Sequence, residues 1–180
     1  PQRGSMDVAG MASAAKSGKL DVLWLLGADE IDLVIPYKAL IKGEADTVLE
    51  YVSESKKACG SRAKLKVIIE SGELKTPALI AQATELAIQG GADFVKTSTG
   101  KVAVNATLEA TEIMLKVIKK SSKPVGFKAA GGVKTSVDAN AYMQLTTEII
   151  GHDYLAPETF RFGASSLLND VYKVLNETQQ

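Results

Sequence analysis

Short runs of β-branched and aromatic residues alternate with longer stretches of helical periodicity along this chain. The predicted strands span residues 31–36, 64–70, 93–99, 124–130 and 160–165. The predicted helices span residues 8–26, 44–58, 77–89, 107–120, 136–149 and 166–176. The strands recur about every 30–35 residues, which is the length of one β/α unit. This alternation predicts an α/β fold built on a parallel sheet, with no linker or domain boundary.

Several predicted helices carry capping signals at their ends. Thr76 precedes Pro77, which places a capping hydroxyl before a proline in the first helical turn. Thr107 and Ser136 are predicted to cap the next two helices, because an acidic residue follows each hydroxyl by two positions. The pair at 90–91, Gly-Gly, is predicted to close the helix before the third strand.

The composition narrows the class of protein without identifying a function. The chain has 180 residues, 46% of them hydrophobic, and its 21 Lys+Arg balance 21 Asp+Glu. We therefore expect one domain over residues 1–180 and no nucleic-acid-binding surface. No apolar run approaches the ~18 residues of a membrane span, and the start lacks a signal-peptide pattern, so no membrane partner is expected. Residues 1–6 contain Gly-Ser-Met, which resembles the remnant of a cleaved tag.

The cysteine and histidine content excludes several kinds of site. The single cysteine, Cys59, cannot form an internal disulfide, which suits a reducing cytoplasmic location. The single histidine, His152, excludes the common triads and a multi-histidine zinc site, and its polar neighbours predict an exposed side chain. The chain also lacks the glycine-rich motifs of dinucleotide-binding and P-loop proteins.

Ionisable residues occupy strand positions that a parallel sheet usually fills with apolar side chains. Alternate positions along the strands are apolar and should face the helices: Leu33, Ile35, Val67, Ile69, Val95, Val125 and Phe127. The positions between them, which point to the opposite face, carry Asp32, Lys66, Glu70, Lys96, Ser98 and Lys128. A buried unpaired charge costs several kcal/mol, so these groups must pair or change their pKa values. One interpretation is a structural salt-bridge network, and the other, which the convergence of four strands favours, is a functional polar interior.

The two lysines at positions 96 and 128 suggest the chemistry of such an interior. They lie at matching depth on consecutive strands, which are ~5 Å apart in a sheet. Burial and a neighbouring cation both favour the neutral, nucleophilic form of a lysine amine. A neutral amine and a carbonyl substrate give a Schiff base, and Asp32 could move the protons.

Three turns that follow strands directly form a second candidate site. They contain Thr99-Gly100-Lys101, Gly131-Gly132-Val133 and Gly163-Ala164-Ser165-Ser166. Glycines let backbone N–H groups approach an anion, and the last turn opens a helix. Barrels of eight β/α units often bind phosphate near their last two strands, so these turns predict phosphate binding over ordinary tight turns.

Five segments resemble the deoxyribose-phosphate aldolase family. They are GADEIDLVIPY (27–37), LKVIIESGEL (65–74), DFVKTSTGKVAVNAT (93–107), VGFKAAGGVKT (125–135) and FRFGASSLL (160–168). The resemblance covers roughly residues 27–176, and it implies a class I aldolase on a TIM (β/α)8-type barrel. Such an enzyme reversibly cleaves 2-deoxy-D-ribose 5-phosphate into D-glyceraldehyde 3-phosphate and acetaldehyde, and it needs no metal or organic cofactor.

The resemblance also implies a role for each matching residue. Lys96 would form the Schiff base, Lys128 would perturb it and join the proton relay, and Asp32 would be the acid/base partner. Lys66 would be a supporting interior lysine. The phosphate site would consist of Gly100, Lys101, Gly131, Gly132, Gly163, Ser165 and Ser166. Ala129 stands where the family commonly has proline, which predicts a slightly looser loop.

The family has three further strands before the one that holds Asp32, so we expect about five of eight strands here. An incomplete barrel leaves the strands of Asp32 and Phe162 as open edges, which predicts a homo-oligomer that covers them. An alternative function is a shortened relative, weakly active or inactive, which keeps the site residues as a phosphate-binding or assembly fragment. Another alternative, based on Ala129, is a class I aldolase for substrates of a different chain length.

Overall fold

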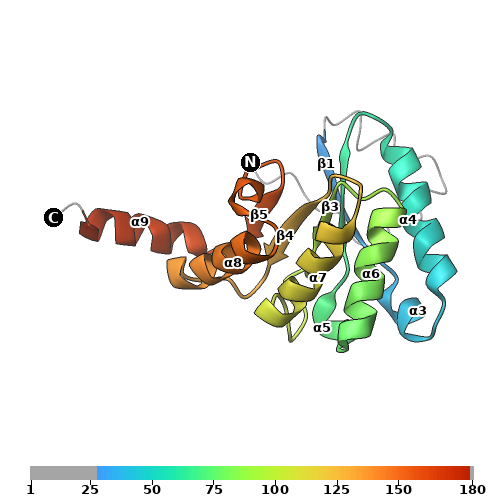
Figure 1. The fold of residues 1–180 in the computed structure, drawn as a ribbon, viewed down its shortest axis with the longest axis horizontal. Coiled ribbons are helices and arrows are strands. Elements are labelled where there is room, and N and C mark those ends of the chain that lie inside the picture. Colours follow the sequence, from blue (N-terminus) through green and yellow to red (C-terminus); the bar gives the residue numbers. More distant parts are fainter. Residues whose placement is uncertain (1–27, 179–180) are drawn as a thin grey trace.

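The computed structural model describes residues 28–178. Within this range five strands form one parallel sheet in chain order, as Figure 1 shows. The strands are β1 (Glu30–Val34), β2 (Lys64–Ile68), β3 (Phe94–Lys96), β4 (Gly126–Ala130) and β5 (Phe160–Gly163). All five predicted strands are confirmed, and the observed ones are shorter by one to four residues. The predicted helix at 8–26 and the possible tag remnant at 1–6 lie outside the described residues.

Helices follow the strands, as the sequence pattern predicts. The longer ones are α4 (Ala45–Cys59), α6 (Pro77–Gln89), α7 (Leu108–Lys120), α8 (Ser136–Ile149) and α9 (Leu167–Thr178). Each agrees with a predicted helix to within two residues at either end. Three short elements were not predicted: α3 (Tyr37–Ile41), α5 (Ser71–Leu74) and the 3-10 helix η1 (His152–Tyr154). A single turn of helix contains too few residues to show a hydrophobic period.

The helix caps agree with the sequence in two cases and differ in a third. The hydroxyl of Thr76 accepts a hydrogen bond from the backbone N–H of Leu79, and Thr107 caps α7 in the same way. For α8 the predicted cap, Ser136, is wrong. Thr135 is the cap, and its hydroxyl and the Asp138 carboxylate form a reciprocal capping box. Thr135 has the extended backbone of a cap residue, whereas Ser136 is already helical.

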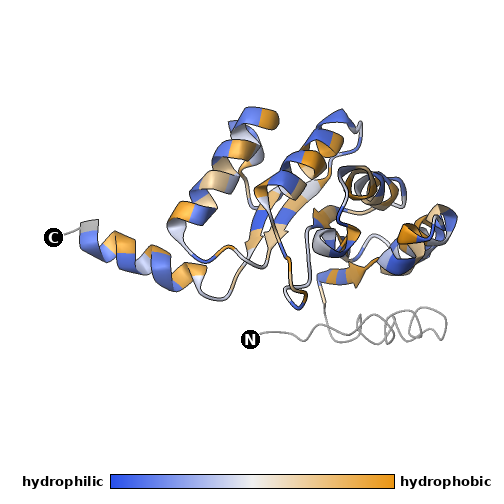
Figure 2. Ribbon diagram, turned by 90° about the horizontal axis from the view of Figure 1, so that it is seen from below, coloured by the Kyte–Doolittle hydropathy of each residue, from blue (hydrophilic) through white to orange (hydrophobic). Residues whose placement is uncertain are grey.

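The apolar side chains at alternate strand positions pack against the helices. Leu33, Val67, Val95 and Phe127 are at most 1% exposed and belong to one continuous core. Helices α4, α6 and α7 lie side by side along this face of the sheet, with α8 beyond them (Figure 1). Figure 2 shows that their hydrophobic and hydrophilic residues alternate around each helix, as expected for helices with one buried face. The core therefore occupies the layer between sheet and helices.

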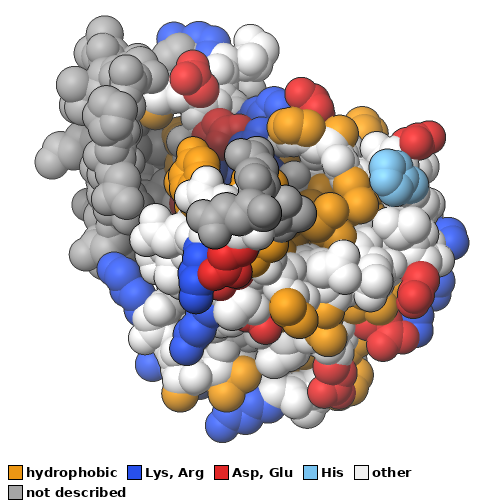
Figure 3. Space-filling view, turned by 90° about the vertical axis from the view of Figure 1, so that its left-hand side faces the viewer, with side chains coloured by type: hydrophobic (Ala, Val, Ile, Leu, Met, Phe, Trp, Pro, Cys, Tyr) orange, Lys and Arg blue, Asp and Glu red, His pale blue; other side chains and the backbone are white. Residues whose placement is uncertain are grey.

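Helix α9 projects from the body of the molecule (Figure 1). It contacts α8 and is joined to the start of that helix by Asp170, which accepts a hydrogen bond from the backbone N–H of Ser136. Several apolar side chains along α9 are open to solvent. Leu168, Tyr172 and Leu175 are 61%, 57% and 52% exposed. They recur at spacings of four and three residues, which places them on one face of the helix. Figure 3 shows hydrophobic side chains on the side of the molecule from which α9 projects.

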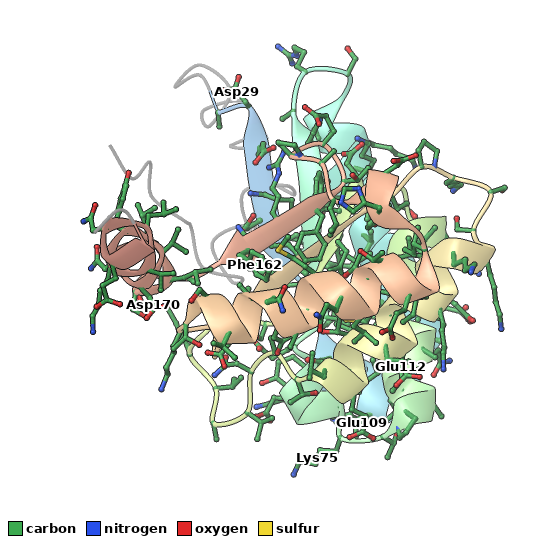
Figure 4. All side chains as sticks on the ribbon, turned by 60° about the vertical axis from the view of Figure 1, so that its left-hand side comes forward. Asp29, Lys75, Glu109, Glu112, Phe162 and Asp170 are labelled. Carbon is green, nitrogen blue, oxygen red and sulfur yellow. The ribbon has the colours of Figure 1, made fainter. Side chains whose placement is uncertain are left out.

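The amino ends and the carboxyl ends of the strands lie at opposite ends of the molecule. Figure 4 shows Asp29, just before β1, at the opposite end of the molecule from Lys75 and Glu109. Lys75 follows α5, after β2, and Glu109 lies in the first turn of α7, after β3. These two residues therefore mark the carboxyl ends of the strands, where the loops that follow the strands gather. No helix within residues 28–178 is both long and apolar enough to cross a membrane.

Candidate active site

The sheet register places the predicted ionisable residues on one face. Asp32 of β1 is the register partner of Lys66 of β2, and Lys96 of β3 is the partner of Lys128 of β4. Lys66 and Lys96 are both only 9% exposed. Because alternate residues of a strand point to opposite faces, these four side chains lie on the face away from the helix-covered core. Figure 2 shows the corresponding hydrophilic bands on the strands.

Asp32 lies between two of the lysines. Its Oδ2 accepts a hydrogen bond from Lys96 Nζ at 2.7 Å. Its Oδ1 is 2.9 Å from Lys66 Nζ, in an ion pair without hydrogen-bond geometry. Burial would raise the pKa of Asp32, but the hydrogen bond from Lys96 and the positive charges of both lysines outweigh burial and lower it. Asp32 is therefore a carboxylate at neutral pH, with one oxygen on each lysine.

Lys128 has a different electrostatic environment from the other two lysines. Among residues 28–178 it forms no salt bridge. Burial lowers the pKa of Lys128, and the positive charges of Lys96 and Lys66 lower it further. Gly163 of β5 gives its side chain room, because a Cβ there would lie 3.0 Å from Lys128 Cε. The arrangement makes the neutral form of Lys128 easier to reach than that of an exposed lysine, beside the ion-paired amine of Lys96.

Glu70, the second carboxylate predicted for this face, does not join the lysines. It follows β2 with a φ of 54°, in the left-handed region, so the alternation of the strand does not extend to it. Its side chain is buried, and its Oε1 accepts a hydrogen bond from the backbone N–H of Thr99 at 3.1 Å. Glu70 therefore supports the turn that follows Lys96 and does not neutralise the lysines.

Two charged residues that sequence reasoning missed complete the cluster. Glu30 of β1 contacts Arg161 of β5 and also Lys66 of β2. The alternation of the strands could have identified both, since Glu30 lies two residues before Asp32 and Arg161 lies between two aromatic residues of β5. We call the six side chains of this face the interior charge cluster: Glu30, Asp32, Lys66, Lys96, Lys128 and Arg161.

The three predicted phosphate turns lie next to one another at the carboxyl ends of the strands. The N–H of Gly131 donates to the carbonyl of Gly163 at 3.0 Å, which joins the second turn to the third. The N–H of Ala106 donates to the carbonyl of Gly131, and the Ser98 hydroxyl donates to Ala130, which joins the first turn to the second. The turns therefore form one continuous edge beside the lysines.

The residues of these turns differ in backbone conformation and exposure. Gly131 and Gly132 have φ values of 77° and 88°, which residues with a side chain rarely adopt. Gly100 and Lys101 are exposed, with Gly100 also at positive φ. Ser165 and Ser166 are exposed as well and directly precede α9. All seven predicted phosphate residues thus lie at this end of the sheet.

Other residues named from the sequence have no part in this site. Ala129 lies inside β4 and is fully buried. The expectation that this residue belongs to a slightly looser loop is therefore wrong. His152 is exposed in η1, as predicted. Cys59 is buried at the end of α4, and burial raises the pKa of its thiol. Within residues 28–178 no three His, Cys, Asp or Glu side chains gather as a metal site would require.

The fold and the site together define a β/α-barrel-type protein with a lysine-rich polar face, here with five parallel strands in residues 28–178. A family model described as DeoC/LacD family aldolase matches residues 11–173. The chain belongs to this family. Over 172 residues it is 52% identical to the deoxyribose-phosphate aldolase of Agrobacterium fabrum. The matched region covers 96% of this chain and 64% of that protein.

Solved structures are similar in fold. A candidate deoxyribose-phosphate aldolase from Coccidioides immitis is 28% identical with a TM-score of 0.71, over 94% of this chain and 58% of that one. The apo form of a candidate deoxyribose-phosphate aldolase from Toxoplasma gondii is 25% identical with a TM-score of 0.79, over 93% of this chain and 64% of that one. The chain thus spans somewhat less than two thirds of the length of these relatives.

Proposed function

We propose that this chain carries the site of a class I deoxyribose-phosphate aldolase, which reversibly cleaves 2-deoxy-D-ribose 5-phosphate to D-glyceraldehyde 3-phosphate and acetaldehyde. The observation that carries the proposal is the pair of register partners Lys96 and Lys128, with Asp32 hydrogen-bonded to Lys96. Membership of the DeoC/LacD aldolase family and the 52% identical relative support the choice of substrate.

In this mechanism Lys96 attacks the aldehyde carbon, C1, of the sugar. The attack needs a neutral amine, and Lys128, with its lowered pKa, is a neighbouring base that can take the proton from Lys96. Loss of water then leaves an iminium at C1. Asp32 remains ionised and can take or return protons within the site.

The iminium draws electrons from the bond between C2 and C3, because acetaldehyde retains C1 and C2. Transfer of the C3 hydroxyl proton to the Asp32 carboxylate breaks that bond and releases glyceraldehyde 3-phosphate. The enamine left on Lys96 is protonated at C2, and water then frees acetaldehyde from the lysine. The protonated imine is the electron sink throughout, so the proposed reaction requires no metal or organic cofactor.

The proposed phosphate site is the edge formed by the three turns. Gly100 and Gly132 would present backbone N–H groups, Gly131 and Gly163 would leave the edge open to the phosphate, and Lys101 would supply a positive charge. Ser165 and Ser166 would place the phosphate at the start of α9, a 12-residue helix whose N-terminal end favours anions. Lys66 would support the site by holding Asp32 in place.

The decisive experiment is reductive trapping. Incubation with 2-deoxyribose 5-phosphate and borohydride should give a covalent adduct, and peptide mapping should place it on Lys96. Lys96→Met should abolish the adduct, whereas Lys120→Met, at an exposed position of α7, should leave it unchanged. Asp32→Asn should slow adduct formation by about a hundredfold, since it removes the acid/base group.

The other outcomes of this experiment are equally informative. An adduct on Lys128 would reassign the nucleophile, and no adduct on any lysine would contradict the Schiff-base proposal. An adduct without release of glyceraldehyde 3-phosphate would support the alternative of a shortened, inactive relative. Phosphate-free 2-deoxyribose should react more slowly, and equal rates would contradict the proposed phosphate site.

We further propose one domain over the whole chain, assembled as a homo-oligomer in the cytoplasm. The buried residues form one continuous hydrophobic cluster, which supports a single domain. Strands β1 and β5 are the two edges of the sheet within residues 28–178, which supports association. The unpaired thiol of Cys59 suits a reducing compartment.

A further inference from the structure

The two edge strands of the sheet are joined by an ion pair across the polar face. Arg161 Nη1 of β5 lies 2.6 Å from Glu30 Oε1 and 2.8 Å from Glu30 Oε2 of β1. These residues are 131 positions apart, and their strands are not neighbours in the sheet. Both side chains are only 27% exposed. The face that carries the interior charge cluster is therefore curved enough to bring the first and last strands together.

Arg161 is held from two further directions. Its Nε donates to the carbonyl of Pro157 at 2.7 Å, and its guanidinium lies 4.5 Å from the centre of the Phe94 ring. Gly126 on the neighbouring strand leaves room for that ring, because a Cβ there would lie 2.3 Å from a Phe94 ring carbon. The guanidinium therefore has a fixed position from which to bind Glu30.

Glu30 also binds a second cation. Its Oε2 is 3.1 Å from Lys66 Nζ, which in turn lies 2.9 Å from Asp32 Oδ1. Burial would lower the pKa of Lys66, but the two carboxylates outweigh burial and raise it. Lys66 is thus a permanent cation held between Glu30 and Asp32, and the contacts form a chain from Arg161 through Glu30, Lys66 and Asp32 to Lys96.

The charges of the cluster do not balance. All five strands contribute: Glu30 and Asp32 from β1, and Lys66, Lys96, Lys128 and Arg161 from β2 to β5. Two carboxylates therefore face four potential cations. Glu30 pairs with both Arg161 and Lys66, so Lys66 needs only one oxygen of Asp32. The other oxygen of Asp32 binds Lys96, and no carboxylate oxygen is left for Lys128. Without Glu30, Lys66 and Arg161 would both compete for Asp32.

We propose that Glu30 and Arg161 are positioning residues of the lysine site, which fix Lys66 and thereby reserve one oxygen of Asp32 for Lys96 and leave Lys128 without a carboxylate. Within residues 28–178 neither residue forms an ion pair with Lys96 or Lys128; both act through Lys66 and Asp32. Their part in turnover rests on the proposed function, whereas their effect on lysine ionisation does not.

The test measures the ionisation of Lys128 directly, in the full chain and without substrate. The titration of the Lys128 side chain is followed by NMR in the wild type, Glu30→Gln, Arg161→Gln and the double variant. Glu30→Gln removes a negative charge that raises the pKa of Lys128, so the titration should move to lower pH. Arg161→Gln removes a cation and should move it to higher pH, and the double variant should return toward the wild type.

A purely structural role predicts a different set of shifts. If the Glu30–Arg161 pair only held the strands together, all three variants would open the face, hydrate Lys128 and move its titration to higher pH. That result, or no shift in Glu30→Gln, would overturn the proposal. Glu148→Gln, at an exposed position on α8, is the matched control and should leave the titration unchanged.

A second measurement connects the pair to the chemistry. In the trapping experiment Glu30→Gln should form the Lys96 adduct about tenfold more slowly, because Asp32 would turn toward Lys66 and Arg161. Glu30→Asp keeps the charge and should recover part of the rate. If the wild type gives no adduct while the titration shifts as expected, the proposed function fails and the positioning role stands. An unchanged trapping rate in Glu30→Gln would contradict that role in turnover.

Discussion

At the scale of single residues, Lys66 and Lys128 show how neighbouring charges give the same side chain opposite properties. Lys66 is buried and Lys128 is half-buried on the same face of the sheet. Two carboxylates flank Lys66 and raise its pKa, whereas burial and two nearby lysines lower the pKa of Lys128. The first lysine therefore stabilises the folded protein as a cation, and the second destabilises it unless it is neutral.

This contrast predicts stability changes of opposite sign. At pH 7, Lys128→Met should raise the free energy of unfolding by roughly 1 kcal/mol, because it removes a half-buried cation that no carboxylate neutralises. Lys66→Met should lower it by about 3 kcal/mol, because two carboxylates lose their shared partner. Urea unfolding of the two variants and the wild type measures both changes. Loss of stability in both variants would contradict the assigned charges.

The pH dependence of the Lys128 effect follows from the direction of its shift. The pKa of Lys128 in the folded state lies below its unfolded value of 10.5. Between these two values the folded state therefore binds fewer protons than the unfolded state, and stability rises with pH. The wild type therefore regains stability over that window, and the advantage of Lys128→Met should shrink toward pH 10.5. A constant advantage from pH 7 to pH 10 would indicate a packing effect instead.

At the scale of elements, the helix starts set the positions of the turns that precede them. The turn after β4 runs from Gly131 to Thr135, where the capping box fixes the first turn of α8. The backbone N–H groups of Lys134 and Thr135 both donate to Asp138. The proposed phosphate turn is therefore anchored at one end by β4 and at the other by this cap.

We expect the cap of α8 to be measurable by substitution. Thr135→Ala should lower the free energy of unfolding by about 1 kcal/mol, because the N–H of Asp138 loses its acceptor. Ser136→Ala should have a smaller effect, since the backbone N–H of Ser136 keeps its bond to Asp170. Thermal or urea unfolding compares the two variants. A larger loss in Ser136→Ala would restore the sequence-based assignment of the cap.

At the scale of the whole molecule, the described part of the chain has surfaces that other parts of a barrel would normally cover. Strands β1 and β5 are the edges of its sheet. The projecting helix α9 exposes Leu168, Tyr172 and Leu175 on one face. Exposed edges and adjacent apolar surface favour association. The relatives are longer than this chain, which spans 64% of the Agrobacterium protein.

The chain should therefore associate in solution in a concentration-dependent way. Light scattering after size-exclusion chromatography should give a mass above that of one chain at micromolar concentration. Replacement of both Leu168 and Leu175 by Lys should weaken association by about tenfold or more, because the helix loses its apolar face. Ile41→Lys, which changes an exposed apolar residue on α3, is the control and should not weaken it. A wild-type monomer at all concentrations would contradict the proposed assembly.

The sequence by itself determined the order of the elements and the face on which the main chemical groups lie. Strand alternation was sufficient to group Asp32, Lys66, Lys96 and Lys128, because the period of two is a local property of extended backbone. Helix periodicity and capping residues gave the longer helices to within two residues. The one-turn helices were missed, because they are too short to show a period.

Only the tertiary structure decided which charges meet. Glu70 left the lysine face because its backbone turns into the left-handed region after β2, and no strand pattern predicts that turn. Glu30 and Arg161 meet because the sheet curves, although 131 residues separate them. The pKa of Lys128 depends on the same curvature, since it reflects the summed field of charges from several strands. Periodicity acts along the chain, whereas electrostatic interaction depends on distances that only the folded sheet defines.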